Sequence, residues 1–291
     1  MFAVGILALV LTGGVIWLTY TQVQTLIHPP RLIVAQTPDD VGITDWQDVT
    51  FESTDGLTLQ GWFIPPDERG ITLILVHGLA ANRGAMLDHA ALLHEQGYGL
   101  LLFDLRNHGA SDGDSTTLGY VESGDVVKAF EVARTLPGVD PERIGLLGES
   151  MGGAAVILAA KHLPEAKAFV VESTFTTLED NVADSIRNDF HLPAYPLTLL
   201  HLAFTSQAGG FPARELRPID AVGAISPRPL LILHGDNDPL FPPFNPERLY
   251  AAAGDPKRLV IMPMNGHGGL IRHAPEAYAA TLLPFLDEHL G

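Results

Sequence analysis

The sequence predicts an α/β protein with a mostly parallel central sheet, helices on both faces of the sheet, and a small helical cap. From residue 46 onward, short apolar segments alternate with stretches of helical character, which is typical of βαβ units. Most of these apolar segments are continuous, as strands are when helices cover both faces. The length of 291 residues is enough for one such domain with a sizeable core.

The composition excludes several classes of protein. Lys and Arg number 17 against 34 Asp and Glu, and the formal net charge of −17 makes nucleic acid an unexpected partner, because such a surface repels phosphate. The chain has no cysteine, which excludes disulfides, thiolate zinc sites and a cysteine nucleophile. With 46% hydrophobic and 18% charged residues, the chain is neither disordered nor fibrous.

The N-terminal segment is expected to lie outside the globular domain. Residues 1–30 contain no charged side chain, and 2–18 is almost wholly apolar. Continued to Tyr20, this run approaches the roughly 20 residues that a helix needs to cross a bilayer, and Trp17 and Tyr20 suit a membrane interface. We therefore expect an N-terminal transmembrane anchor over residues 1–22, with a cleaved signal peptide or a docked helix as the alternatives. Too few basic residues lie nearby to orient a single-pass anchor, so the side of the membrane stays open.

A proline-containing stretch follows this segment. Residues 23–45 include His-Pro-Pro at 28–30 and Thr-Pro-Asp-Asp at 37–40. Proline cannot continue a helix and biases the preceding residue to extended backbone. We therefore expect 23–45 to be a linker, followed by one α/β domain over 46–291.

The expected elements of the domain follow in chain order. A hairpin with a Ser-Thr-Asp-Gly turn comes first, at 49–52 and 57–64. Six buried strands of the parallel type are expected at 71–76, 99–103, 144–147, 168–171, 230–233 and 259–262. Helices are expected at 85–96, 124–136, 151–163, 246–253 and 275–289. In such sheets ligands bind beyond the carboxyl ends of the strands, so the chemistry is expected there.

The fullest chemical signal is a Gly-x-Ser-x-Gly sequence at 148–152, between a predicted strand and an Ala-rich helix. The flanking glycines allow a turn tight enough to present Ser150 Oγ above the sheet. The same turn puts the backbone amide of Met151 at a helix N-terminus, where it can stabilise an oxyanion. The pattern alone is weak, but its strand–turn–helix context favours a nucleophilic serine over an exposed turn serine.

A serine hydroxyl needs an adjacent base to act as a nucleophile. Among the 12 histidines, His267 follows the last predicted strand and precedes the last helix, so it can reach the same sheet edge. His273 is the nearest rival, but it falls closer to the final helix. Three histidines at other strand ends each precede a glycine in a turn and are expected to bond loop backbone: His77, His108 and His234.

The base in turn needs a carboxylate that orients it. The segment His-Gly-Asp-Asn-Asp at 234–238 offers two. Asp238 lies farther beyond the strand and can approach the base, whereas Asp236 sits close to the strand end and is expected to cap the turn. The chain order is then Ser150, Asp238, His267, which is the order typical of α/β-hydrolases.

On these motifs the chain resembles the α/β-hydrolase superfamily, and in particular its serine aminopeptidase and monoacylglycerol lipase-like group, from about residue 46 to the C-terminus. The resemblance implies that Leu79, in the His-Gly loop after the third strand, supplies an oxyanion amide beside that of Met151. It also implies that the turn at 104–111 is structural, with Asn107 in the left-handed conformation where the family has glycine. The serine at the elbow argues against dehalogenase or epoxide hydrolase chemistry, since those relatives carry an aspartate there.

A long segment over about residues 176–227 separates two predicted strands, and the resemblance implies that it forms the small cap over the site. It contains an apolar stretch broken by prolines at 191–204. An apolar cap would form a water-poor pocket suited to an acyl chain, although the same side chains could simply pack the cap onto the domain.

These observations predict a serine hydrolase that cleaves a carboxylic ester, lipid-like if the anchor is real, through an acyl-enzyme. Ser150 is the expected nucleophile, His267 the base and Asp238 its orienting carboxylate, while the amides of Leu79 and Met151 bind the oxyanion. The expected partners are a small ester or acyl substrate and, through the N-terminal helix, a membrane. No cofactor and no metal is expected. A peptidase or amidase, a perhydrolase or acyltransferase, and a membrane-tethered binding module on an inactive hydrolase fold are the alternatives.

Overall fold

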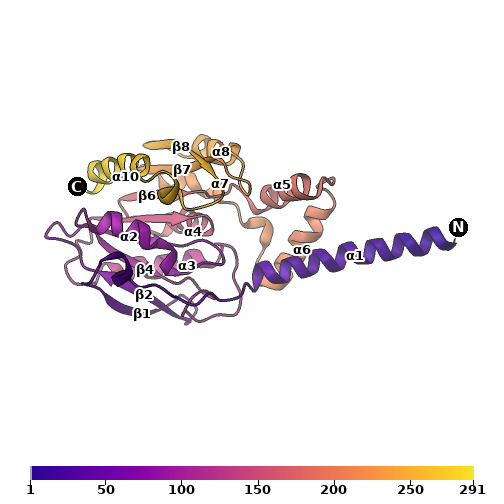
Figure 1. Ribbon diagram of the computed structural model, residues 1–291, viewed down its shortest axis with the longest axis horizontal. Helices are drawn as coiled ribbons and strands as arrows, with labels where there is room; N and C mark the ends of the chain where they lie inside the picture. Colours follow the sequence, from indigo (N-terminus) through magenta and orange to yellow (C-terminus); the bar gives the residue numbers. More distant parts are fainter. Residues whose placement is uncertain (1) are drawn as a thin grey trace.

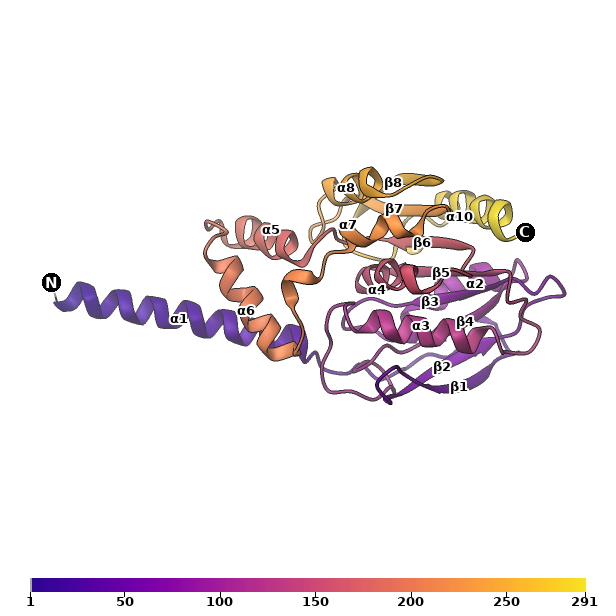
Figure 2. The same cartoon turned by 180° about the vertical axis from the view of Figure 1, so that it is seen from behind.

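A computed structural model describes residues 2–291 of the chain, and the side chains of all of these except 2–8, 11, 189 and 265. Within this part, eight strands form one sheet in the order β1-β2-β4-β3-β5-β6-β7-β8 (Figures 1 and 2). The strands are β1 (Gln47–Glu52), β2 (Thr58–Ile64), β3 (Thr72–Val76), β4 (Gly99–Phe103), β5 (Ile144–Glu149), β6 (Ala168–Glu172), β7 (Leu230–Asn237) and β8 (Lys257–Asn265). β2 pairs antiparallel with β1 and β4, and all later pairs are parallel. The sheet is therefore mixed and mostly parallel, as predicted.

Helices cover both faces of this sheet (Figure 1). One face packs against α3 (Glu122–Ala133), α4 (Met151–Ala159), α7 (Pro218–Ala221) and α8 (Phe244–Ala252). The other face packs against α2 (Leu87–His94), α9 (Leu270–His273) and α10 (Pro275–Leu290).

The central strand β3 shows why the apolar segments of the sequence are continuous. Ile74 and Val76 pack with the cluster on one face of the sheet, whereas Leu73 and Leu75 pack with the cluster on the other. All four side chains are fully buried. Successive side chains of a strand point to opposite faces, so a sheet covered on both sides needs an apolar residue at every position.

Two helices, α5 (Leu178–Phe190) and α6 (Leu197–Gly209), lie between β6 and β7 in the chain, and we call them the helical insert. They stand away from the sheet, beyond the carboxyl ends of its strands (Figures 1 and 2). α5 begins where the side chain of Thr177 accepts a hydrogen bond from the amide of Asp180, a standard helix N-cap.

The N-terminal helix α1 (Phe2–Ile27) projects from the domain at its N-terminal end, and its C-terminal end packs against α6 (Figure 1). Val23 and Ile27 are fully buried there. The expected linker begins at residue 23, but the helix continues to Ile27 because Pro29 is the first proline that can end it. The segment after the helix also lies on the domain: Ile43 is buried, and Arg31 donates a hydrogen bond to the Ser111 carbonyl.

Part of the predicted anchor over residues 1–22 lies outside what the structure describes, namely Met1 and the side chains of residues 2–8 and 11. Among the residues that are described, no helix has both the length and the apolar character needed to cross a membrane.

Candidate active site

Ser150 occupies a strained turn between β5 and α4. Its backbone angles are φ +54° and ψ −117°, a left-handed region that costs about 1–3 kcal/mol for a residue other than glycine. A Cβ on Gly148 would lie 2.5 Å from the Gly152 carbonyl oxygen, and a Cβ on Gly152 would lie 2.2 Å from that of Val76. Both glycines are therefore required by close backbone approach, as expected for a turn that presents the serine above the sheet.

Hydrogen bonds to β6 and the segment after it hold this turn. The Ser150 amide donates to the Glu172 carbonyl at 2.8 Å, and the Thr174 hydroxyl donates to the Ser150 carbonyl at 2.9 Å. The serine is 8% exposed. The strain of the turn is thus offset by a fixed local network, and the hydroxyl stays accessible to a small molecule.

His267 lies on the loop after β8 and connects the serine to a carboxylate. Its Nε2 is 2.8 Å from Ser150 Oγ, and its Nδ1 is 2.7 Å from Asp238 Oδ2. The ring of Phe241 meets the imidazole edge to face, with centroids 4.8 Å apart. The three side chains that the sequence singled out, widely separated along the chain, are therefore brought into one hydrogen-bonded series.

The two carboxylates of the 234–238 segment have different partners. The side chain of Asp238 is fully buried, and its Oδ1 accepts hydrogen bonds from the amides of Leu240 and Phe241 at 2.8 and 3.0 Å. Asp236 instead accepts from the amide of Met264 at 2.9 Å, so it ties the end of β7 to β8. This agrees with the expectation that Asp238 approaches the base and Asp236 satisfies backbone.

The remaining histidines at strand ends are bonded to backbone, as predicted. His77 Nε2 accepts from the Leu105 amide at 3.1 Å, so Nδ1 donates to the Gly78 carbonyl at 2.7 Å. Burial, helped by the neighbouring His108, lowers the pKa of His77 to about 3, which keeps the imidazole neutral. Backbone contacts of the same kind occupy His108, His234 and His273.

The two amides expected to bind an oxyanion border the space beside Ser150. Met151 is the first residue of α4, so its N–H has no partner within the helix. Leu79 lines the cavities on both sides of the serine. Its loop approaches the serine closely, since a Cβ on Gly78 would lie 3.2 Å from Ser150 Cβ.

Two cavities meet at Ser150. The first, about 320 Å³, has mostly apolar walls that include Leu26, Phe175 and Ile186. The second, about 440 Å³, also has mostly apolar walls, but it adds His267 and the carboxylate of Glu149. A carbonyl group at the serine would therefore border one space with no charged residue and another that holds the base and a carboxylate.

The turn at 104–111, which the resemblance assigns a structural role, holds the neighbouring loops. Asp104 accepts hydrogen bonds from the amides of Arg83 and Ala110 at 2.7 and 2.8 Å. Asn107 has φ +59°, so the left-handed conformation predicted for it is confirmed. These contacts are structural and do not reach the serine.

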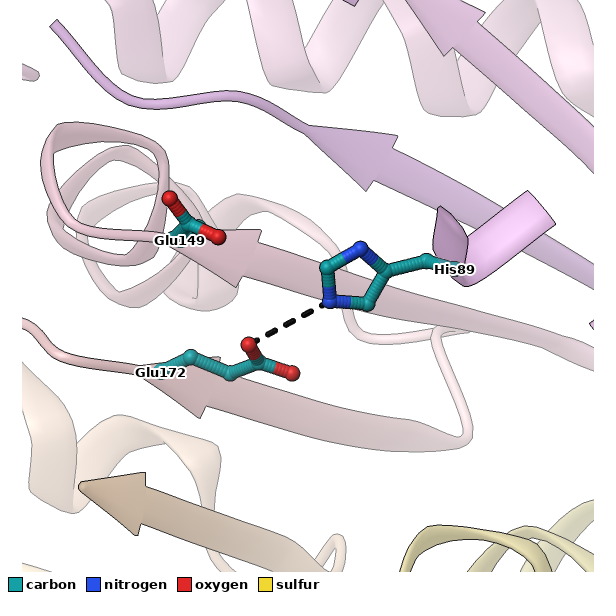
Figure 3. A group of neighbouring side chains, drawn as sticks. All are labelled: His89, Glu149 and Glu172. Atoms are coloured by element: carbon teal, nitrogen blue, oxygen red, sulfur yellow. Dashed lines mark hydrogen bonds and ion pairs between the residues drawn. The ribbon is translucent and has the colours of Figure 1, made fainter. Parts of the chain in front are cut away.

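A cluster that the sequence did not predict adjoins the serine turn through Glu149; His89 and Glu172 in it are buried, and Glu149 is partly buried (Figure 3). His89 on α2 faces Glu172 at the end of β6, with Nε2 3.3 Å from Oε2, and Tyr278 donates its hydroxyl proton to the same carboxylate. The nearest ligand atoms of His89, Glu149 and Glu172 lie within 4.8 Å of one another, a set of residue types that could hold a divalent cation. Burial disfavours a charged imidazole, but the ion pair outweighs this and raises the pKa of His89.

The same cluster supports the loop that carries His267. Glu149 precedes Ser150, and its carboxylate accepts a hydrogen bond from the amide of Gly269, at 3.3 Å. This contact connects the serine turn to the histidine loop beside the cavity that His267 lines. The only sequence signal for the two carboxylates of this cluster was their position at the ends of adjacent strands. Pairing of the parallel strands β5 and β6 brings Glu149 and Glu172 side by side.

Comparisons with known proteins identify the family and the fold of the chain. Residues 89–291 match the sequence model of the prolyl oligopeptidase family (Peptidase_S9). The Pf2001 esterase of Pyrococcus furiosus is 26% identical, with a TM-score of 0.77 over 91% of this chain and 99% of that chain. The uncharacterized protein Rv2307c of Mycobacterium tuberculosis is 34% identical over 266 residues, covering 91% of this chain and 86% of its own length. The α/β-hydrolase domain-containing protein WAV2 of Arabidopsis thaliana is 28% identical over 253 residues, covering 84% and 79%.

Proposed function

Because this chain belongs to the prolyl oligopeptidase family, a branch of the α/β-hydrolases, we propose that it is a serine hydrolase that cleaves small carboxylic esters through an acyl-enzyme. The observation that carries the proposal is the unbroken series of contacts from Asp238 through His267 to Ser150, with N···O distances of 2.7 and 2.8 Å. The similarity to an esterase favours an ester over a peptide substrate. The coarser prediction, membership of the α/β-hydrolase superfamily, is confirmed; the narrower serine aminopeptidase and monoacylglycerol lipase-like assignment stays a proposal.

The proposed reaction has two halves. Nε2 of His267 takes the hydroxyl proton as Ser150 Oγ attacks the ester carbonyl carbon, and the same proton passes to the leaving alcohol when the C–O bond breaks. A water molecule then attacks the acyl-enzyme while His267 takes its proton; the C–Oγ bond breaks, the carboxylic acid leaves, and His267 returns the proton to Ser150 Oγ. Asp238 accepts a hydrogen bond from the Nδ1–H group throughout, which keeps Nε2 free to take the proton and stabilises the imidazolium.

The negative charge that develops on the carbonyl oxygen requires donors. We assign them to the amides of Leu79 and Met151, the second of which also lies at the positive end of the α4 dipole. One donor of this kind contributes about 2.7–4 kcal/mol of transition-state stabilisation. These two backbone groups and the three side chains form the complete proposed machinery.

The proposal is tested with a panel of p-nitrophenyl esters and aminoacyl p-nitroanilides. We expect the esters to be cleaved, and the rate to fall by about 10⁶-fold in Ser150→Ala, because the nucleophile is lost. Ser123→Ala is the matched control: this serine lies on α3 and donates to the Tyr120 carbonyl, away from both cavities.

Other outcomes of the same panel point elsewhere. Cleavage of the anilides alone would favour a peptidase or amidase, which the family match also makes a candidate. New peracid or transferred ester, formed with added peroxide or alcohol, would favour a perhydrolase or acyltransferase. Failure of every substrate in folded protein would contradict an enzymatic function and favour a binding module.

We also propose that the segment over about 176–227, with α5 and α6, is the cap of this site, and that the N-terminal segment holds the enzyme at a membrane. Exposed apolar side chains on α1 support the second proposal, among them Leu9, Trp17 and Leu18. Sedimentation with lipid vesicles tests it: the full chain is expected in the pellet, and recovery in the supernatant would contradict attachment.

A further inference from the structure

The apolar cavity beside Ser150 continues past the serine toward the N-terminal helix. We call it the inner chamber, and its neighbour of about 180 Å³ the outer chamber. Both are lined by four common residues: Gln22, Ile186, Phe190 and His201. The two chambers therefore adjoin and run between α1 and the helical insert.

The walls of both chambers suit a hydrocarbon chain. None of the described residues that line them is charged. His201 is the one imidazole at their junction among those residues, and burial lowers its pKa to about 4, so it is neutral at neutral pH. The hydroxyl of Thr19, in the outer chamber, donates to the Val15 carbonyl within the helix. Uncharged polar side chains also line the inner chamber, namely Gln22, Asn181 and Ser185, but most of its wall is apolar, so the path gains free energy from contact with methylene groups.

The length of the path can be read from α1. Leu26 lines the inner chamber, and Val15 lines the outer chamber, on the same helix. At 1.5 Å per residue these positions are roughly 16 Å apart along the axis. The hydrocarbon core of a bilayer is about 30 Å thick, so one leaflet, and hence one acyl chain of a membrane lipid, has nearly this length.

The position of His267 decides which side of the ester enters the chambers. The leaving alcohol must receive its proton from His267, so it has to lie in the cavity that this imidazole lines. That cavity, of about 440 Å³, is also lined by Asn188 and Glu149, whereas His267 does not line the inner chamber. The alcohol part therefore occupies this cavity, beside His267, and the acyl part occupies the inner chamber, whose lining holds no charged residue.

We propose that the substrate is a long-chain acyl ester of a polar alcohol, with its acyl chain in the inner and outer chambers alongside α1. This inference rests on the ester hydrolase function proposed above and names its substrate class. The products are a long-chain carboxylic acid and the free alcohol, formed with one water and no other reactant. α1 is then a wall of the substrate site, not only a means of attachment.

The test compares two tryptophan substitutions on the same helix. Thr19→Trp fills the outer chamber. Ile16→Trp is the control, because the Ile16 side chain is 43% exposed and lines neither chamber. With p-nitrophenyl esters from acetate to laurate, we expect kcat/KM of the unmodified protein to rise roughly fourfold per methylene, equivalent to about 0.8 kcal/mol each. Thr19→Trp should lower the laurate-to-butyrate ratio of kcat/KM by about tenfold or more, and Ile16→Trp by less than about twofold.

Two additions keep the result interpretable. Leu197→Trp fills the same chamber from α6, so it replaces Thr19→Trp if that variant does not fold. Calorimetric binding of laurate to Ser150→Ala, and its loss in Ser150→Ala/Thr19→Trp, tests the chambers without any turnover.

The outcomes separate this inference from the proposed function. Equal kcat/KM for butyrate and laurate, or a ratio unchanged by filling the outer chamber, would overturn the inference and leave ester hydrolysis standing. If the protein hydrolyses no ester but binds laurate, and the double variant does not bind laurate, the proposed ester hydrolysis is refuted. The same result would support the two chambers as a binding site for an acyl chain.

Discussion

Replacing Asp238 by asparagine tests the role of the carboxylate with almost no change in shape. One oxygen of Asp238 accepts hydrogen bonds from the backbone amides of Leu240 and Phe241, and the other accepts a hydrogen bond from Nδ1–H of His267. Asparagine has only one acceptor oxygen. The two backbone amides will hold that oxygen, so the NH₂ group must face the imidazole.

The magnitude follows from this orientation. Reversing the amide would leave two buried N–H groups without an acceptor, at about 1–3 kcal/mol each. The NH₂ group of the introduced asparagine therefore donates to Nδ1, which forces the proton of His267 onto Nε2, where it faces Ser150 Oγ. An imidazole in this tautomer cannot accept the serine proton, and we expect kcat to fall by about 10⁴-fold, the size of the tautomer effect known for serine proteases.

The assay is hydrolysis of p-nitrophenyl butyrate, with Asp236→Asn as the control. Asp236 lies two positions earlier and accepts one backbone proton, from Met264, which an amide oxygen can also accept. We expect the control to keep its rate within about threefold of the parent, a change under 1 kcal/mol. A folded Asp238→Asn protein that retains more than about a tenth of the parental kcat would refute the tautomer argument.

Three further predictions concern stability, measured by urea unfolding. Gly152→Ala places a Cβ 2.2 Å from the Val76 carbonyl oxygen and should destabilise the fold by about 3 kcal/mol; an unchanged midpoint would contradict the close approach. The pKa of His77 is lowered from its usual 6.5 to about 3 in the folded protein. Between these two pH values the imidazole is protonated in the unfolded state but not in the folded state, so the free energy of unfolding falls as the pH drops below about 6.5. His77→Gln should therefore remove about 2 kcal/mol of the stability change between about pH 7.5 and 5, and an unaltered change would be inconsistent with a buried neutral imidazole. Glu172→Gln leaves the His89 imidazole without its carboxylate and should destabilise by about 3 kcal/mol, of which a second change, His89→Leu, recovers part; strictly additive losses would argue against the ion pair.

The sequence predicted the sheet and the candidate site because both depend on local patterns. Continuous apolar segments identified the parallel strands, and the carboxyl ends of such strands share one edge. Ser150 could be assigned from the Gly-x-Ser-x-Gly motif between a strand and a helix, and His267 because it closely follows the last strand. The choice of Asp238 over Asp236 needed only its greater distance beyond the predicted strand at 230–233; in the structure β7 continues to Asn237, so Asp236 lies within it.

Features that depend on contacts between distant segments could not be predicted. The apolar sequence of α1 is the same whether the helix meets lipid or protein, and only its packing on α6 shows that Val23 and Ile27 are buried. The pairing of His89 with Glu172 joins a helix to a strand end far along the chain, with no pattern in either segment to indicate it. For the same reason, the two chambers emerge only from the folded arrangement.

The central claim is that Ser150 is a nucleophile activated by His267. Its most direct test is labelling of the folded protein with a fluorophosphonate, followed by mass spectrometry of the peptides. We expect one adduct, on Ser150, that is absent in Ser150→Ala and forms much more slowly in His267→Ala. No adduct on the folded protein, or an adduct on a different serine, would contradict it.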